Sequence, residues 1–151
     1  MSVKKPARHK LRKARISIQN QIYLVTFVTE KRQIRFADLL CARIMIQALR
    51  GSSNAETLAF TVMPDHVHWL LQLQNQASLS RVLQSLKSTS AHQLNRHLGR
   101  KGQFWQDGFH DHALRKEEDV IDAARYIVAN PLRAGLVSSV GDYPHWDAIW
   151  L

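Results

Sequence analysis

The spacing of apolar residues along the chain predicts an alternation of strands and helices. Runs rich in β-branched and aromatic residues favour strands, and apolar residues that recur every three or four positions favour helices. In chain order, the predicted elements are a strand over 22–29, a helix over 36–50, strands over 58–63 and 66–74, a helix over 78–98, a short strand over 109–114 and a helix over 116–129.

The turn residues between these elements indicate how the strands are arranged. Pro64 and Asp65 separate two strands by a short turn, which predicts that the two strands pair as an antiparallel hairpin. The order strand–helix–strand–strand–helix–strand is typical of an α+β fold with a ferredoxin-like split βαβ antiparallel sheet and helices.

The strand predicted over 66–74 begins with two histidines, His66 and His68. Successive side chains of a strand alternate between faces, so both imidazoles project from one face, while Val67 and Trp69 point the other way into a core. Two imidazoles on one face make half of a metal site. The remaining donors, at least one oxygen among them, must come from elsewhere. Histidines that are only packed or hydrogen-bonded remain the alternative, because a spacing match needs its context.

The last predicted helix offers a tyrosine and an amide on one face. Tyr126 and Asn130 stand four residues apart, just ahead of Pro131, which disfavours helical geometry in the residue before it. A tyrosine hydroxyl can act as a covalent nucleophile, and an amide oxygen can ligate a divalent metal. The alternative is that Tyr126 packs at a rim and Asn130 simply ends the helix.

The charge of the chain indicates a polyanionic partner. There are 21 Lys and Arg residues against 12 Asp and Glu residues, a net charge of +9 with a pI near 10.2. This imbalance favours binding to nucleic acid or to an anionic membrane surface. Residues 1–15 hold basic residues and no acidic ones, which predicts a flexible arm that contacts phosphates, or a solvated tail. Residues 16–151 are predicted to form one domain.

Cysteine content and hydropathy narrow the setting. Cys41 is the only cysteine, so no disulfide framework is expected and a cytoplasmic location fits. No apolar run approaches the ~18 residues that a membrane span requires, so no membrane partner is expected.

Several blocks of the sequence resemble one family. Residues 63–68, Met-Pro-Asp-His-Val-His, resemble the HUH motif of single-tyrosine transposases, in which U is a bulky apolar residue. Residues 126–137 are similar to the tyrosine-helix signature of the REP-associated tyrosine transposases, an IS200-like branch of that superfamily. Residues 102–106 and 109–115 resemble the middle block of this branch, and Leu86-Lys87-Ser88 fits its preceding helix. The resemblance extends from about residue 22 to residue 144.

The resemblance implies an HUH nuclease fold and an enzyme. The implied activity is metal-dependent nicking and strand transfer of single-stranded DNA at REP-type hairpins, through a 5′-phosphotyrosine intermediate, as in DNA transposition. Tyr126 would be the nucleophile, and His66, His68 and Asn130 would hold Mg²⁺ or Mn²⁺, of which Mn²⁺ suits imidazole ligands better. The protein would act as a monomer or a homodimer. The alternative is a domesticated protein that binds DNA hairpins without catalysis.

The resemblance also bears on rival residues. The second H-x-H, His110-Asp111-His112, belongs to the middle block, so we expect the metal at His66 and His68 instead. Tyr23 at a strand start and Tyr143 before a proline are expected to be structural. The residues expected to contact DNA are Arg12, Arg15, Lys87, Arg100, Lys101, Trp105, Arg115, Arg125 and Arg133. Trp105 would stack on a base or, as the alternative, anchor the core.

Overall fold

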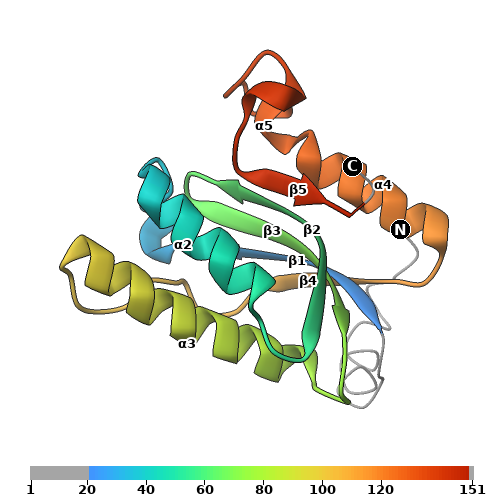
Figure 1. The fold of residues 1–151 in the computed structure, drawn as a ribbon, viewed down its shortest axis with the longest axis horizontal. Helices are drawn as coiled ribbons and strands as arrows, with labels where there is room; N and C mark the ends of the chain where they lie inside the picture. The colour runs from blue at the N-terminus through green and yellow to red at the C-terminus, as the bar shows by residue number, and fades with distance from the viewer. Residues whose placement is uncertain (1–20, 150–151) are drawn as a thin grey trace.

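The computed structural model describes residues 21–149, and its centre is a five-stranded antiparallel sheet with the strand order β4-β1-β3-β2-β5 (Figure 1). The strands are β1 (Ile22–Val28), β2 (Ala55–Met63), β3 (His66–Leu73), β4 (His110–Leu114) and β5 (Trp146–Ala148). The helices are α2 (Leu39–Arg50), α3 (Leu79–Leu98), α4 (Glu117–Val128) and the one-turn α5 (Asn130–Arg133), with 3₁₀ turns η1 (Glu30–Arg32) and η2 (Val140–Asp142). The basic arm predicted over residues 1–15, with Arg12 and Arg15, lies outside the described residues.

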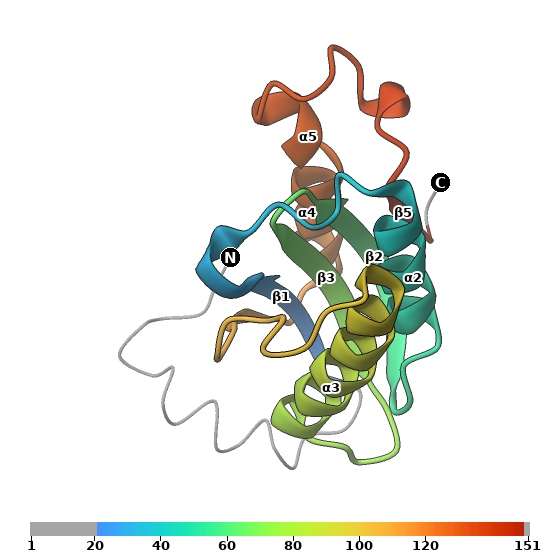
Figure 2. The same ribbon diagram turned by 90° about the vertical axis from the view of Figure 1, so that its left-hand side faces the viewer.

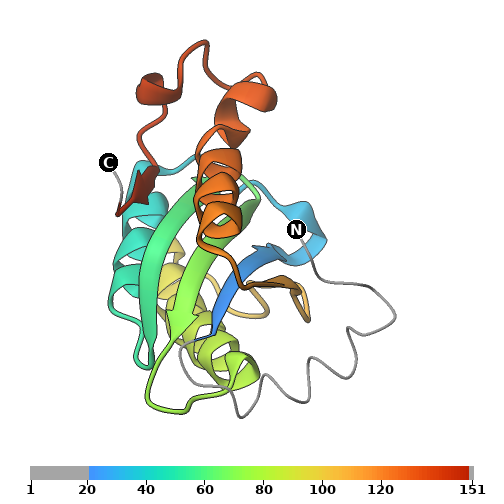
Figure 3. The same ribbon diagram turned by 90° about the vertical axis from the view of Figure 1, so that its right-hand side faces the viewer.

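Helices cover both faces of the sheet. Helices α2 and α3 pack against one face, and α4 lies alone across the other, as the two side views show (Figures 2 and 3). The first face builds the larger core, where Trp69 and Phe27 are fully buried against residues such as Met45 and Leu83. The second core lies under α4. Strand β2 therefore has buried apolar residues on both faces, with Phe60 and Val62 in the first core and Leu58 and Ala59 in the second.

The observed element order agrees with the predicted α+β, ferredoxin-like arrangement. Pro64 and Asp65 form the turn of the β2–β3 hairpin, as predicted. The predicted start of the first helix at residue 36 is wrong by three residues. Asp38 caps α2 by accepting hydrogen bonds from the backbone N–H groups of Leu40 and Cys41, and Phe36 is buried ahead of the cap.

Two features at the C-terminal side were not predicted. Strand β5 pairs with Ala59–Thr61 at the edge of the sheet. The one-turn helix α5 follows α4, which ends at Val128, within one residue of the predicted end; Pro131 lies near the first position of α5, where its missing N–H costs nothing. None of the helices within residues 21–149 is long and apolar enough to cross a membrane.

Candidate metal and tyrosine site

His66 and His68 lie on β3, the central strand of the sheet. Their neighbours Val67 and Trp69 are fully buried in the α2–α3 core, so the two imidazoles project from the opposite face, toward α4. This confirms the alternation predicted from the sequence. Strand β3 is hydrogen-bonded to β1 on one side and to β2 on the other, which fixes the register of both histidines. Their ring centroids are 4.8 Å apart.

Each imidazole is oriented through its Nδ1 atom. The Asp65 carboxylate accepts a hydrogen bond from Nδ1 of His66 at 2.7 Å. Nδ1 of His68 lies 2.9 Å from Oγ1 of Thr26, its cross-strand neighbour on β1. Metal-binding histidines are commonly held in this way by a carboxylate or another polar group on the far ring nitrogen. Arg32 completes the arrangement by donating to the other oxygen of Asp65 at 3.2 Å.

The electrostatics favour a neutral imidazole at His68. Burial, followed by the charges of His66 and Arg133, lowers the pKa of His68 to about 3. Its ring therefore keeps a lone pair at neutral pH, which is the form that ligates a metal. Burial alone would raise the pKa of Asp65, but His66 and Arg32 outweigh it and lower the pKa overall, so the carboxylate that orients His66 stays charged.

The chain brings Asn130 directly to His68 although 62 residues separate them in sequence. Nδ2 of Asn130 lies 3.0 Å from Nε2 of His68, and Oδ1 accepts a hydrogen bond from Arg133 at 3.0 Å. The guanidinium of Arg133 also lies 3.8 Å from the centroid of the Tyr126 ring, a cation–π contact. Tyr126 is 58% exposed.

The donor set of this group fits a divalent transition-metal ion. The two imidazoles and the side-chain amide of Asn130 lie close together, and each ring is oriented by a partner on its Nδ1 atom. The amide nitrogen faces His68 and the amide oxygen faces Arg133, so the amide would turn over to offer its oxygen to an ion. Imidazole suits Mn²⁺ better than Mg²⁺, which prefers oxygen ligands. His66, His68 and Asn130 are therefore the residues that could hold the ion.

A buried threonine ties the helix that carries Tyr126 to the strand that carries His68. Thr61 on β2 is the cross-strand neighbour of His68, and its hydroxyl donates a 2.7 Å hydrogen bond to the carbonyl of Ile127 on α4. The side chain is completely buried. Neither Thr61 nor Thr26 was expected from the sequence, because their roles follow from strand register.

A cavity of about 500 Å³ opens between α4 and the sheet, beside Tyr126. Its lining residues are Leu24, Thr26, His68, His112, Asp119, Asp122, Ala123 and Tyr126. The second H-x-H thus lies on the same face as the first, because His110 and His112 on β4 pair with Thr26 and Leu24 on β1. His112 borders the cavity, whereas Asp111 between them points to the other face and is buried.

The expected DNA contacts divide into exposed and engaged residues. Lys101 and Arg115 are exposed. Arg125 and Arg133 are exposed too, but Arg125 pairs with Asp122, and Arg133 contacts Asn130 and the Tyr126 ring. Lys87 is partly buried and donates to the carbonyls of Gln106 and Gly108 at 2.8 and 2.9 Å, which holds the segment before β4 in place. Arg100 donates to Oδ1 of Asn95 at 2.6 Å.

Trp105 belongs to the core, the alternative that the sequence left open. It is 4% exposed, and its ring packs edge-on against Phe27 and Phe104. Its indole N–H donates to Oγ of the buried Ser90 at 3.0 Å. The ring is enclosed on its faces and its polar atom is satisfied, so it presents no surface on which a base could stack.

The rival tyrosines are structural, as expected. Tyr23 is completely buried in the larger core. The Tyr143 hydroxyl donates a 2.6 Å hydrogen bond to the carbonyl of Val62, and burial raises its pKa to about 12. Of the three tyrosines, Tyr126 alone combines exposure with proximity to the histidine pair.

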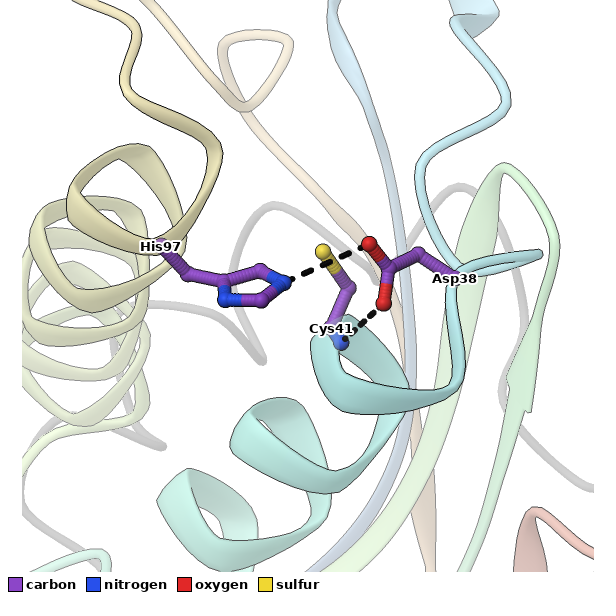
Figure 4. Close-up of side chains that lie close together, drawn as sticks. All are labelled: Asp38, Cys41 and His97. Carbon is purple, nitrogen blue, oxygen red and sulfur yellow. Dashed lines mark hydrogen bonds and ion pairs between the residues drawn. The ribbon is translucent and has the colours of Figure 1, made fainter.

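A second group of side chains that could hold a metal ion lies between α2 and α3. Asp38 and Cys41 from the start of α2 meet His97 from the end of α3, with ligand atoms within 4.8 Å of one another (Figure 4). The carboxylate of Asp38 already caps α2 and lies 3.3 Å from Nε2 of His97. Burial, followed by the charge of Asp38, raises the pKa of the Cys41 thiol to about 11, so the thiol keeps its proton at neutral pH. The positive end of the α2 dipole at this position also disfavours a cation. These interactions describe a structural link between the helices.

Comparisons with known proteins show the family of the chain. Residues 17–130 match the family model of IS200-like transposases. A Haemophilus influenzae protein assigned as a REP-associated tyrosine transposase is 33% identical over 100 residues, which cover 60% of this chain and 57% of that protein. The chain thus spans little more than half the length of that relative. The REP-associated tyrosine transposase of Escherichia coli is 31% identical over 123 residues, covering 81% of this chain and 72% of the relative.

The fold is shared with a solved structure. A REP-associated tyrosine transposase bound to a REP hairpin superposes with a TM-score of 0.68 at 25% identity, over 86% of this chain and 78% of that one. The resemblance and the fold class inferred from the sequence are thereby confirmed.

Proposed function

We propose that this chain, which belongs to the IS200-like transposase family, cuts and rejoins single-stranded DNA beside a hairpin, with Tyr126 as the nucleophile and a divalent metal ion at His66, His68 and Asn130. The observation that carries the proposal is the approach of the Tyr126–Asn130 segment to the histidine pair, with Asn130 at 3.0 Å from His68. An exposed tyrosine, two oriented imidazoles and an amide oxygen are the parts that such a reaction requires.

The residues divide the chemistry between them. The Tyr126 oxygen attacks the phosphorus atom, the bond from phosphorus to the 3′ oxygen breaks, and the phenol proton is lost as the leaving oxygen gains one. The products are a 5′-phosphotyrosine and a free 3′-hydroxyl, and the reverse step with another 3′-hydroxyl rejoins the strand. When bound, the metal ion polarises and orients the phosphate. Arg133, stacked on the Tyr126 ring, places a positive charge where the phenolate and phosphate charges meet.

The charge of the chain and its relatives support the hairpin substrate. A net charge of +9 favours a nucleic-acid partner, and exposed Lys101 and Arg115 could contact phosphates. The protein of the solved structure that shares this fold is bound to a REP hairpin. We infer that this chain takes the same class of DNA.

The test uses hairpin oligonucleotides of the REP type, with single-stranded flanks and a label at the 3′ end. With Mn²⁺ or Mg²⁺, a labelled covalent adduct should survive denaturing electrophoresis, since the 3′ fragment stays on the tyrosine. The adduct should be absent with EDTA and with Tyr126→Phe. Tyr143→Phe is the matched control, because it removes a hydroxyl that is bonded to the Val62 carbonyl and does not line the cavity beside Tyr126, and it should still form the adduct.

The outcomes separate the enzyme from its alternative. Tight hairpin binding by the wild-type protein without any adduct would favour a DNA-binding protein that does not cut. An adduct that persists in Tyr126→Phe would disprove the assignment of the nucleophile.

A further inference from the structure

We propose that the cavity beside Tyr126 is a pocket for one base of the cut strand, and that Asp119 and Asp122 make it select a base with an exocyclic amine (cytosine, adenine or guanine) over thymine. This inference rests on the proposed function and adds a specificity to it. No role in the reaction above uses either carboxylate.

The cavity lies directly beside the nucleophile. Asp119, Asp122 and Tyr126 are spaced by three and four residues, so they share one face of α4, and this face looks onto Thr26 and His68 of the sheet. A nucleotide whose phosphate lies between Tyr126 and the histidines has its base within reach of this space. The volume of about 500 Å³ is in the range of pockets that enclose small ligands.

The charge of the lining indicates which part of the nucleotide enters. Two carboxylates repel a phosphate, although the chain as a whole carries a charge of +9. The neutral base is therefore the part that fits. Arg125 pairs with Asp122 at 3.8 Å, but both side chains are exposed, so the pair is weak and leaves the carboxylate able to accept other hydrogen bonds.

The arrangement does not fit a metal ion instead. Within residues 21–149, ligand atoms of three His, Cys, Asp or Glu side chains converge to within 4.8 Å only at Asp38, Cys41 and His97. The carboxylates and His112 at this cavity are more widely separated. They line the walls of a space instead of surrounding a point.

Hydrogen-bond chemistry then determines the selected base. A carboxylate only accepts, so it pairs with the exocyclic amines of cytosine (N4), adenine (N6) and guanine (N2), whereas thymine has no amine and repels it through its O4 and O2 acceptors. Leu24 and Ala123 supply apolar surface for the plane of the base. Bases extruded into enzyme pockets are read in this way, by edge contacts and by stacking on apolar side chains.

The experiment measures base preference near the cut. Hairpin oligonucleotides carry each of the four bases in turn at the two positions on either side of the cleavage point, and the rate of adduct formation is measured for each. The wild-type protein should prefer cytosine, adenine or guanine over thymine at one position, by about 5- to 100-fold. Asp119→Asn and Asp122→Asn should reduce that preference, because an amide also donates hydrogen bonds and accepts thymine.

A matched control and a second measurement keep the two proposals apart. Glu118→Gln changes an exposed acid in the same helical turn, outside the cavity, and should keep the wild-type preference. The same oligonucleotides are also bound to Tyr126→Phe, which reads the preference without covalent chemistry. If no adduct forms, the proposed function fails while the binding series still decides the pocket. The pocket is disproved if the wild-type protein shows no preference at any position, or if both Asn variants retain it.

Discussion

Replacing Thr61 by valine tests whether one buried hydrogen bond holds the nucleophile helix in place. The hydroxyl of Thr61 donates to the Ile127 carbonyl at 2.7 Å, next to Tyr126 in sequence, and Thr61 is also the cross-strand neighbour of His68. Valine has nearly the same shape, so Thr61→Val removes the bond without opening a cavity. The substitution should lower the free energy of unfolding and slow adduct formation.

The magnitude follows from the burial of the bond. A net hydrogen bond contributes about 1 kcal/mol, and an orphaned buried carbonyl costs ~1–3 kcal/mol. The backbone N–H of Ala129 also reaches the Ile127 carbonyl and keeps it partly satisfied, so the lower part of this range applies. We expect a loss of about 1–2 kcal/mol, which for a domain of this size lowers the melting temperature by roughly 3–6 °C.

The assays are thermal and urea unfolding, together with the rate of adduct formation on the hairpin oligonucleotide. Thr61→Ser is the matched variant, since it keeps the hydroxyl and loses only a methyl group. Serine should retain most of the adduct rate, whereas valine should not. The reasoning is wrong if Thr61→Val has the stability and rate of the wild-type protein. Equal losses in both variants would assign the effect to methyl packing.

Two further predictions concern stability alone. Trp105→Ala should lower the free energy of unfolding by ~3–5 kcal/mol, because the ring is enclosed and hydrogen-bonded to Ser90, and Trp105→Phe should lower it less. Urea denaturation measures both changes. A Trp105→Ala protein with wild-type stability but weakened hairpin binding would contradict the core assignment. The backbone N–H of Cys41 lowers the pKa of Asp38 below its usual 3.8, and His97 lowers it further. The Asp38 carboxylate therefore stabilises the fold fully above pH 3.8, and this stabilisation is lost as the pH falls through the lowered pKa. Asp38→Asn should therefore flatten the acid limb of the urea midpoint plotted against pH, and identical limbs for both proteins would refute this.

The fold was largely predictable because its elements carry their own patterns. Strand β3 alternates between His66 or His68 and buried apolar residues, and α3 repeats its apolar positions over five turns, so local sequence was sufficient. Strand β5 was missed for the opposite reason. Its three residues have no pattern of their own, and their extended conformation depends on pairing with β2.

The candidate site was predictable only in its separate halves. Spacing placed His66 with His68, and Tyr126 with Asn130, but no spacing rule places Asn130 against His68 across 62 residues. That contact depends on how α4 packs on the sheet. The orienting role of Thr26 likewise depends on the register of β1 against β3, and only packing identifies a tryptophan such as Trp105 as a core residue.

The histidines lie on a strand and Tyr126 lies on a helix, and these two elements differ in how easily they move. His66 and His68 belong to the central strand, whose backbone is bonded on both sides, and such a strand opens only when the whole sheet unfolds. Tyr126 belongs to a helix that side-chain packing and the Thr61 bond hold against the sheet, and a docked helix separates at a smaller free-energy cost. A DNA end joined to Tyr126 is therefore attached to the more easily displaced part of the protein, while the two imidazoles stay fixed in the sheet.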